Sequence, residues 1–206
     1  MQKEEQTDIL KSNISTETIA VAGVSDNTGV THLCIMLAVF LSSVAAKKVA
    51  LVEMNQSGCI RQAGIILDEF HVKARKTFHK VAIFTQADEE NLSEVISSDY
   101  DYVIIDYGKY DEDIRQSFIM CRRKIIVGSL SWWKIQHYVG FLAKADKKAE
   151  YKWEYYAVNP VTWGIRYLRH TFGINIRLIP FEPDPFLLGR NTLEFMTVFF
   201  GSRFWK

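Results

Sequence analysis

Residues 18–41 read TIAVAGVSDNTGVTHLCIMLAVFL: a β-branched run, a short loop containing glycine, and a long apolar segment. The run at 18–22 predicts a buried strand, and the uncharged segment at 33–46 predicts a helix that is apolar on nearly all sides. A strand, a glycine-containing loop and a helix in this order form a typical first unit of an α/β fold. We therefore expect a sheet whose first strand leads directly into a buried helix.

The rest of the chain repeats this alternation. Strands are predicted at residues 48–52, 81–84, 101–106, 124–127, 155–158 and 174–179. Helices are predicted at residues 59–70, 91–97, 111–121, 132–148, 162–170 and from about 186 onwards. Strands that are continuously apolar favour a parallel sheet with helices on both faces. The predicted fold class is therefore α/β, a doubly wound, mostly parallel sheet in three layers.

The composition is that of one globular domain. The chain has 206 residues, of which 48% are hydrophobic and 24% are charged. These values exclude a disordered polymer, a collagen-like fibre and a disulfide scaffold. We expect a polar N-terminal arm at residues 1–17 and a single domain at 18–206. With 25 Lys and Arg against 24 Asp and Glu, the charge balance gives no reason to expect a nucleic-acid partner.

The cysteines and the apolar segments indicate a cytoplasmic protein. Cys34, Cys59 and Cys121 are odd in number and widely spaced, which fits neither a disulfide framework nor a metal motif. We expect all three to be small buried hydrophobic residues. The first seventeen residues lack the apolar core of a signal peptide, and segment 33–46 is too short to span a bilayer.

The loop at residues 23–31 has part of the pattern of a phosphate-binding loop. Such loops read GxxxxGK[ST] and bind phosphate through backbone N–H groups at a helix N-terminus. Here Gly29 and Thr31 are present, but Val30 stands where the lysine belongs, and the nearby Asp26 would repel a phosphate. The alternative is a structural turn in which Asp26 or Thr28 caps the following helix.

Five stretches together resemble the ParA/MinD family of ATPases, which carry a deviant phosphate loop. The family loop reads KGGVGKTT, and residues 25–32 read SDNTGVTH, so both lysine positions, Ser25 and Val30, have lost their charge. YDYVIIDYG resembles the strand that ends in the magnesium-associated carboxylate, here Asp106, and KVALVEMN places Glu53 and Asn55 at the family's next acidic positions. YAVNPV and LIPFEPD resemble the segments beside the adenine.

The resemblance implies a P-loop NTPase-like fold, with ATP or ADP and Mg²⁺ as ligands. Thr31 and Asp106 would bind the magnesium ion, and in an active enzyme Asp106 and Asn55 would be catalytic. The nucleotide would contact Gly29, Val30, Thr31, His32, Glu53, Asp106, Asn159, Pro180 and Glu182. The family also implies a homodimer and a protein partner. Among its members, the TadZ/CpaE group of pilus-assembly proteins is most similar in character.

Three functions follow from these residues. The leading hypothesis is a degenerate family member, non-catalytic or weakly nucleotide-binding, that acts as an assembly or positioning factor through protein contacts. The alternative is an active ATP-dependent switch that recruits its lysine from elsewhere, such as Lys109 or a partner subunit. The third is a small-molecule ligase or kinase of the same superfamily, for which the sequence shows no second substrate site.

Three further segments have unusual composition. Residues 71–80 are basic and are interpreted as a solvated face, whereas the stretch from Asp88 to Asp113 is strongly acidic and could steer self-association. The C-terminal segment at 193–206 is aromatic. Core or dimer packing is favoured for it over contact with the inner face of a membrane. Trp132 and Trp133, at the start of a predicted helix, are interpreted as packing residues.

Overall fold

A computed structural model describes residues 16–69, 80–145 and 152–201 of the chain. Its seven strands form one parallel sheet in the order β3-β2-β4-β1-β5-β6-β7. The strands are β1 (Glu17–Gly23), β2 (Val49–Glu53), β3 (Val81–Phe84), β4 (Tyr102–Lys109), β5 (Arg123–Ser129), β6 (Trp153–Val158) and β7 (Ile176–Leu178). All seven predicted strands are present, and the predicted fold class is confirmed.

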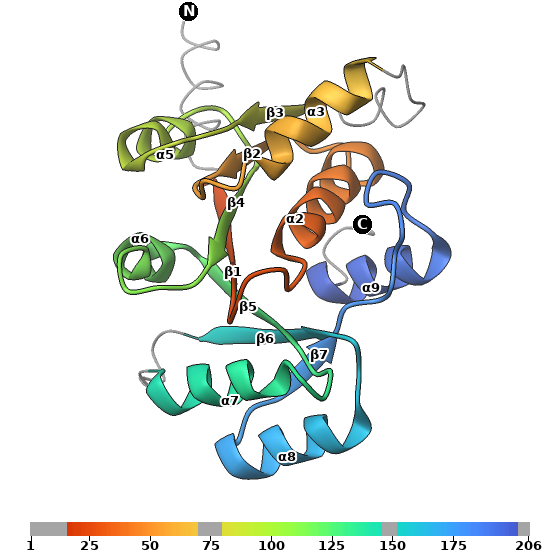
Figure 1. Ribbon diagram of the computed structural model, residues 1–206. Coiled ribbons are helices and arrows are strands. Elements are labelled where there is room, and N and C mark those ends of the chain that lie inside the picture. The colour runs from red at the N-terminus through yellow and green to blue at the C-terminus, as the bar shows by residue number, and fades with distance from the viewer. Residues whose placement is uncertain (1–15, 70–79, 146–151, 202–206) are drawn as a thin grey trace, which may run out of the picture.

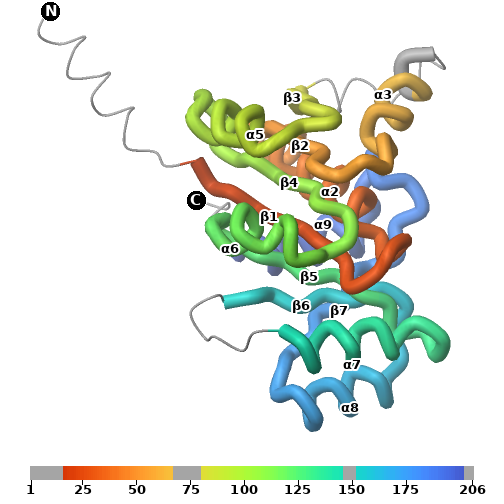
Figure 2. Tube along the Cα trace, turned by 60° about the vertical axis from the view of Figure 1, so that its left-hand side comes forward, coloured from red at the N-terminus to blue at the C-terminus, as the bar shows by residue number. Residues whose placement is uncertain are grey.

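Helices cover both faces of this sheet (Figures 1 and 2). They are α2 (Val30–Val39), which continues into the π-helical η1 (Phe40–Val44), α3 (Cys59–Glu69), α5 (Glu89–Ile96), α6 (Arg115–Met120), α7 (Ile135–Lys144), α8 (Thr162–Phe172) and α9 (Arg190–Phe200). Figure 1 shows α5 and α6 on one side of the sheet and α2 and α9 on the other, with α7 and α8 at one end.

Alternate side chains of each strand enter two separate hydrophobic clusters. In β1, Ile19 and Val21 pack with α2, η1 and α9, whereas Ala20 and Ala22 pack with α5, α6, α7 and α8. This division follows from the period of two residues in a strand. It also explains why the strands are apolar on both sides and why α2, in the middle of one layer, has apolar residues around most of its circumference.

Some predicted element boundaries were wrong. The last helix begins at Arg190 rather than near Phe186, after a loop that contains Pro183 and Pro185. The helix predicted from Trp132 begins at Ile135, because Ser131–Lys134 forms a turn in which the N–H of Lys134 donates to the carbonyl of Ser131 at 3.0 Å. Strand β4 runs on to Lys109, three residues beyond its predicted end at Asp106.

Three predictions about individual side chains were also wrong. Cys34 and Cys121 are buried as expected, but Cys59 is exposed at the start of α3. Trp132 and Trp133 were interpreted as packing residues, yet they are 66% and 73% exposed. Both tryptophans precede the first residue of α7, so neither lies on the face that this helix packs against the sheet.

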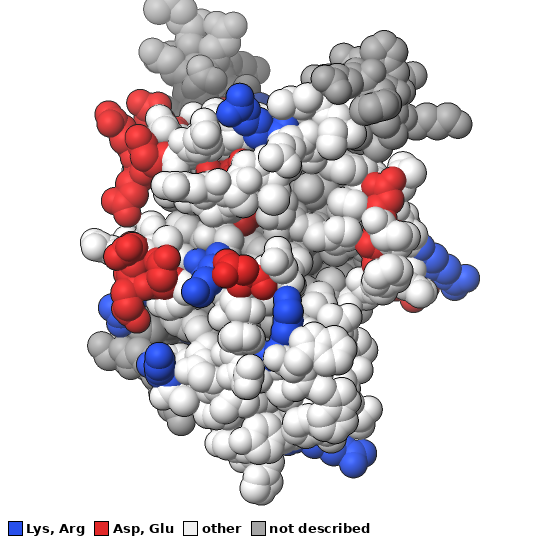
Figure 3. All heavy atoms as spheres, in the orientation of Figure 1, with Lys and Arg blue, Asp and Glu red and all other residues white. Residues whose placement is uncertain are grey.

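Most of the acidic side chains between Asp88 and Asp113 lie on the surface. The exposed carboxylates of α5 and of the turn before α6 lie on the same side of the molecule (Figure 3), and Asp106 is the fully buried exception. The basic segment at 71–80 and most of the polar arm lie outside the described residues, so these two predictions are untested. Within the described part, no helix is long and apolar enough to cross a bilayer.

Candidate functional site

The loop between β1 and α2 has the backbone form of a phosphate-binding loop. Gly29 is the N-cap of α2 with φ 85° and ψ 23°, a left-handed conformation that glycine adopts without strain. A Cβ on Gly23 would lie 2.3 Å from Thr28 Oγ1 and 2.9 Å from the carbonyl oxygen of Ser25, so the loop folds tightly against the end of β1. Both positions require glycine.

The loop is not explained by side-chain capping of α2. Neither Asp26 nor Thr28 caps the helix: no side chain makes a cap hydrogen bond, and the Thr28 hydroxyl donates to the carbonyl of Ser25 at 3.1 Å. The alternative interpretation as a capped turn is therefore wrong. The first N–H groups of a helix have no partner within the helix, so those of α2 remain oriented toward a ligand position at its N-terminus.

Asp106 lies at the centre of a hydrogen-bond network beneath this loop. Its Oδ2 accepts from the Thr31 hydroxyl at 2.6 Å, and its Oδ1 accepts from Asn55 Nδ2 at 2.9 Å and from the Gly108 N–H at 2.8 Å. Three sequence-predicted residues are thus in direct contact. Burial raises the pKa of Asp106 above its ordinary value; the Thr31, Gly108 and Asn55 hydrogen bonds oppose this, and the Glu53 charge adds to it.

Glu53 lies beside Asp106 on the neighbouring strand and is fully buried. Its Oε1 accepts from the Ile60 N–H at 3.0 Å and from the Ser57 hydroxyl at 3.4 Å, which ties the end of β2 to the start of α3. Its Oε2 has no hydrogen-bond partner among the described residues. A buried carboxylate oxygen without a donor is costly, and a nearby cation would satisfy it.

A pocket of about 590 Å³ opens above this network. Three segments line it. They are the loop between β1 and α2 at residues 23–31, called here the phosphate-type loop, with the start of α2; the segment that follows β2; and the end of β4. Its lining residues are Ser25, Asp26, Asn27, Thr28, Gly29, Val30, Thr31, His32, Asn55, Gln56, Ser57, Cys59, Gly108 and Lys109. Lys109 is the single lysine or arginine in this lining. Glu53 and Asp106 lie behind the lining residues. Glu53 is hydrogen-bonded to Ser57 of the lining, and Asp106 is hydrogen-bonded to Thr31 and Asn55.

A bulge in β4 positions Lys109. Val21 pairs with Asp106 and Gly23 pairs with Lys109, so β4 holds one more residue than β1 between these pairs. Gly108 lies in this bulge with φ 64°, and a Cβ there would be 3.0 Å from Asn55 Cβ. Bulges turn side chains toward sites in this way. The only sequence signal for the bulge in β4 was the glycine two residues after Asp106.

The residues predicted to lie beside an adenine are outside this pocket. Asn159 Nδ2 donates to Ser129 Oγ at 3.3 Å, at the ends of β6 and β5. Glu182 Oε2 accepts from the Gly189 N–H at 2.7 Å and from the Thr192 hydroxyl at 2.8 Å, so this side chain stabilises the start of α9. Asn159, Pro180 and Glu182 are therefore not brought together with the phosphate-type loop in the described pocket.

Comparison with known proteins identifies the fold. No protein-family model matches the chain, and no curated protein matches its sequence. Among solved structures, it resembles a ParA family ATPase from Chlorobium tepidum TLS, with a TM-score of 0.61 and 16% identity over 89% of this chain and 93% of that one. It also resembles a plasmid partition protein from Borrelia burgdorferi B31 bound to AMPPNP, with a TM-score of 0.60 and 14% identity over 87% and 94% of the two chains.

A third similar structure is the MinD cell division protein of Aquifex aeolicus, with a TM-score of 0.56 and 18% identity over 82% of this chain and 83% of that one. The chain has the ParA/MinD-like fold. This agrees with the fold that the five sequence stretches implied. At identities of this size the comparison establishes the fold alone, so the function must be argued from the residues in the pocket.

Proposed function

We propose that this protein is a degenerate member of the ParA/MinD type that binds nucleotide weakly or not at all and does not hydrolyse it. It acts as an assembly or positioning factor through protein contacts, in machinery of the pilus or secretion kind. The observation that carries the proposal is the composition of the phosphate-type loop. Its backbone form is retained, but Val30 replaces the lysine and Asp26 contributes a carboxylate to the pocket wall.

The loss of the loop lysines is expected to reduce hydrolysis of a nucleotide more than its binding. Loss of one charge-assisted contact, worth roughly 1.5 to 3 kcal/mol, weakens binding about ten- to a hundredfold. Removal of one preorganised donor for developing charge lowers a rate on the order of a hundredfold or more. The loop lacks both lysines of the related loop, and Asp26 adds repulsion. Binding at high nucleotide concentration without turnover is the expected behaviour.

The residues at the floor of the pocket suit a magnesium ion. Their donors are a hydroxyl, two carboxylates and an amide, and hard oxygen donors are the ligands that Mg²⁺ prefers. Thr31 and Asp106 would hold the ion, and the unsatisfied Oε2 of Glu53 is consistent with a cation nearby. The ion would neutralise phosphate charge, while the chain supplies N–H groups from the loop and excludes water from Asp106.

An equilibrium titration tests this proposal. Fluorescently labelled ATP and ADP, with magnesium, are titrated with the wild-type protein, Asp26→Asn and Val30→Lys, and phosphate release is followed in parallel. We expect weak binding that strengthens when the loop carboxylate is removed or the lysine is restored. Asp26 is exposed, so its substitution leaves the fold intact. Micromolar binding to wild type with multiple-turnover phosphate release that Asp106→Ala abolishes would contradict the proposal.

One observation favours the alternative, an active ATP-dependent switch. The bulge in β4 brings Lys109 into the pocket lining, where its ammonium group could replace the missing lysine. In that case millimolar ATP should raise the melting temperature of the wild type, because a ligand that binds the folded state stabilises it. Lys109→Gln should remove the rise, whereas Lys144→Gln, an exposed lysine outside this pocket, should not. Absence of any rise in the wild type argues against the switch.

A further inference from the structure

Four aromatic side chains are exposed together at the end of the molecule formed by α7 and α8. Trp132 and Trp133 are 66% and 73% exposed, and Trp163 and Tyr167 are 38% and 43% exposed. The ring centroids of Trp132 and Trp163 lie 4.7 Å apart, and those of Trp163 and Tyr167 lie 6.1 Å apart. We call these four residues the aromatic end surface. Exposed tryptophans in contact with one another indicate an interaction surface.

The aromatic end surface is not a poorly packed part of the core. Helix α8 has a second side that is tightly packed: Leu168 is fully buried, and a Cβ on Gly164 would lie 2.9 Å from Ile135 Cδ1 of α7. Trp163 and Tyr167 are spaced four residues apart and lie on the solvent side of the same helix. The side of α8 that faces the domain is therefore packed without these two rings, which lie on the outer side of the helix.

The two helices that carry this surface contain basic side chains and no Asp or Glu. Residues 127–145 and 155–181 contain no Asp or Glu, although they contain several Lys, Arg and His. Arg166, Arg169 and His170 of α8 are exposed, and α7 ends in the exposed Lys144. In Figure 3, acidic side chains lie over α5 and α6 and also toward α9, but none is visible over α7 and α8.

We propose that the aromatic end surface docks onto an anionic lipid bilayer. Tryptophan and tyrosine prefer the interfacial region of a membrane, and Lys and Arg are attracted to anionic headgroups. All four rings are exposed, so they are accessible to lipid headgroups. Helices α7 and α8 form an end of the molecule (Figures 1 and 2), which a flat surface can reach without meeting α5 or α6. The charged side chains of α7 and α8 are basic, so they suit an anionic membrane surface. Such a surface has no fixed cationic groups that would require carboxylate partners on the protein.

Co-sedimentation with vesicles tests the proposal on the full chain without nucleotide. Phosphatidylcholine vesicles with and without phosphatidylglycerol serve as probes, and tryptophan fluorescence is recorded on the same samples. We expect the protein to pellet with the anionic vesicles, with a blue shift of the emission. Pelleting should decrease as salt is added, because screening weakens the attraction between charges.

Two variants separate the aromatic and basic contributions. Trp132→Ala with Trp133→Ala removes exposed rings and should abolish the blue shift and most of the pelleting. Arg166→Gln with Arg169→Gln should lower the partition coefficient about 25-fold, at roughly fivefold for each charge removed. The matched controls are Met120→Ala on α6 and Arg190→Gln on α9, which are equally exposed and should bind like the wild type. Circular dichroism verifies that each variant is folded.

Three outcomes would overturn the proposal. The first is no pelleting of the wild type with anionic vesicles. The second is equal pelleting of the wild type and both surface variants. The third is pelleting that disappears when residues 202–206 are removed, since this would assign membrane contact to the C-terminal segment. If a single-stranded oligonucleotide displaced the protein from vesicles and bound it more tightly than they do, the surface would be a nucleic-acid site instead.

Discussion

Asp106 is a fully buried carboxyl group directly beneath the pocket. Burial raises its pKa above the ordinary value for aspartate, and the charge of Glu53 acts in the same direction. A carboxyl whose pKa is raised in the folded state binds more protons there than in the unfolded chain. Its contribution to stability is therefore fully present below the unfolded pKa and is lost as pH rises through the folded pKa.

Asp106→Asn should for this reason stabilise the protein at neutral pH. The amide can keep the contacts of the carboxylate, because its oxygen accepts from Asn55 and Gly108 while its nitrogen donates to Thr31. We expect a melting temperature higher by a few degrees at pH 7 and a difference that shrinks as pH is lowered. Differential scanning fluorimetry across this range measures it. A lower melting temperature at pH 7 would show that the ionised carboxylate is required for folding, and the exposed Asp26→Asn is the control.

Gly128 of β5 is required by a close approach. A Cβ at this position would lie 2.2 Å from the ring of Tyr138, a fully buried side chain of α7. Gly128→Ala should destabilise the protein by about 1 to 3 kcal/mol through overpacking. Gly140→Ala is the matched control: nothing lies within 4 Å of its Cβ position in α7, so it should stabilise by about 0.5 to 1 kcal/mol. Urea denaturation measures both, and equal effects would contradict the packing argument.

The contact of Thr31 with Asp106 could be predicted from the sequence, and Lys109 was named there as a possible substitute lysine, but the bulge that brings Lys109 into the pocket lining could not be predicted. Thr31 follows a glycine loop and Asp106 ends an apolar run, so both belong to the same edge of a parallel sheet. Lys109 enters the pocket only because β4 bulges at Gly108, and a bulge depends on the pairing of two distant strands. The exposure of Trp132 and Trp133 was missed for a similar reason, since it depends on where α7 begins.

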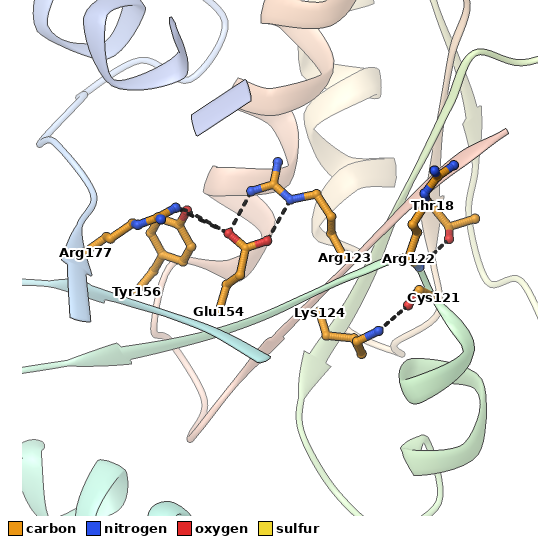
Figure 4. Close-up of polar contacts among 8 residues, drawn as sticks. All are labelled: Thr18, Cys121, Arg122, Arg123, Lys124, Glu154, Tyr156 and Arg177. Atoms are coloured by element: carbon orange, nitrogen blue, oxygen red, sulfur yellow. Dashed lines mark hydrogen bonds and ion pairs between the residues drawn. The ribbon is translucent and has the colours of Figure 1, made fainter. Parts of the chain in front are cut away.

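At the scale of elements, a charged network joins β5, β6 and β7 (Figure 4), and its Arg123 also contacts α9. Glu154 accepts from Arg123 Nε at 2.7 Å and from Arg123 Nη2 at 2.8 Å, and the Tyr156 hydroxyl donates to it at 3.2 Å. The Arg123 guanidinium carbon lies 3.8 Å from the ring centroid of Phe199 in α9. One bidentate pair therefore connects two strands and orients a cation against the last helix.

Glu154→Gln should destabilise the protein by roughly 1 to 3 kcal/mol at neutral pH. Burial alone would raise the pKa of Glu154, but the hydrogen bonds and charge of Arg123, together with Tyr156 and Arg177, lower it. A lowered pKa contributes stability that is present above the unfolded pKa and is lost as pH falls through the folded pKa. The difference between wild type and variant should therefore vanish on acidification, as measured by denaturation at several pH values.

The control for this prediction is Glu194→Gln. Glu194 forms an exposed pair with Arg190 one turn away in α9, where such pairs contribute little. If Glu154→Gln had as small an effect as the control, the network would not stabilise the fold.

Helix α9 shows why element types were easier to predict than their contacts. Its apolar spacing indicated a helix that covers the sheet, and Met196 and Phe199 are buried as this requires. Phe200 also packs inward, with its ring stacked on that of Phe40 at 5.5 Å. Two residues of the segment considered for membrane contact are thus part of the packing of the domain. Residues 202–206 lie outside the described part, and the prediction for them stays open.

At the scale of the whole molecule, the near-zero net charge results from separated regions of opposite sign. The acidic helix α5, the acidic turn before α6, and the helices α7 and α8, which contain no carboxylates, all pack against one sheet of seven strands. Surfaces of this kind influence association with partners over distances near the Debye length, about 10 Å at 0.1 M salt. The fold was predictable because the strands alternate with helices, but no local pattern reveals which surfaces face the same way.

Self-association should not depend on nucleotide. The resemblance implies that the family's lysine at the position of Ser25 crosses its dimer interface, and here this residue is uncharged and followed by Asp26. Static light scattering should give the same molecular mass with and without magnesium and ATP. A dimer that forms only with ATP would contradict this expectation and would favour the switch. Ser25→Lys with Val30→Lys is the matched gain-of-charge variant.

The position of β1 in the sheet has a consequence for synthesis of the chain. Both neighbours of β1 come from much later in the sequence, since β1 pairs with β4 and β5 and with no earlier strand. Helix α2, apolar around most of its circumference, leaves the ribosome roughly 100 residues before β5 is complete, which at about 5 to 20 residues per second is roughly 5 to 20 seconds. During that interval the apolar surface of α2 lacks part of the sheet that covers it in the folded protein.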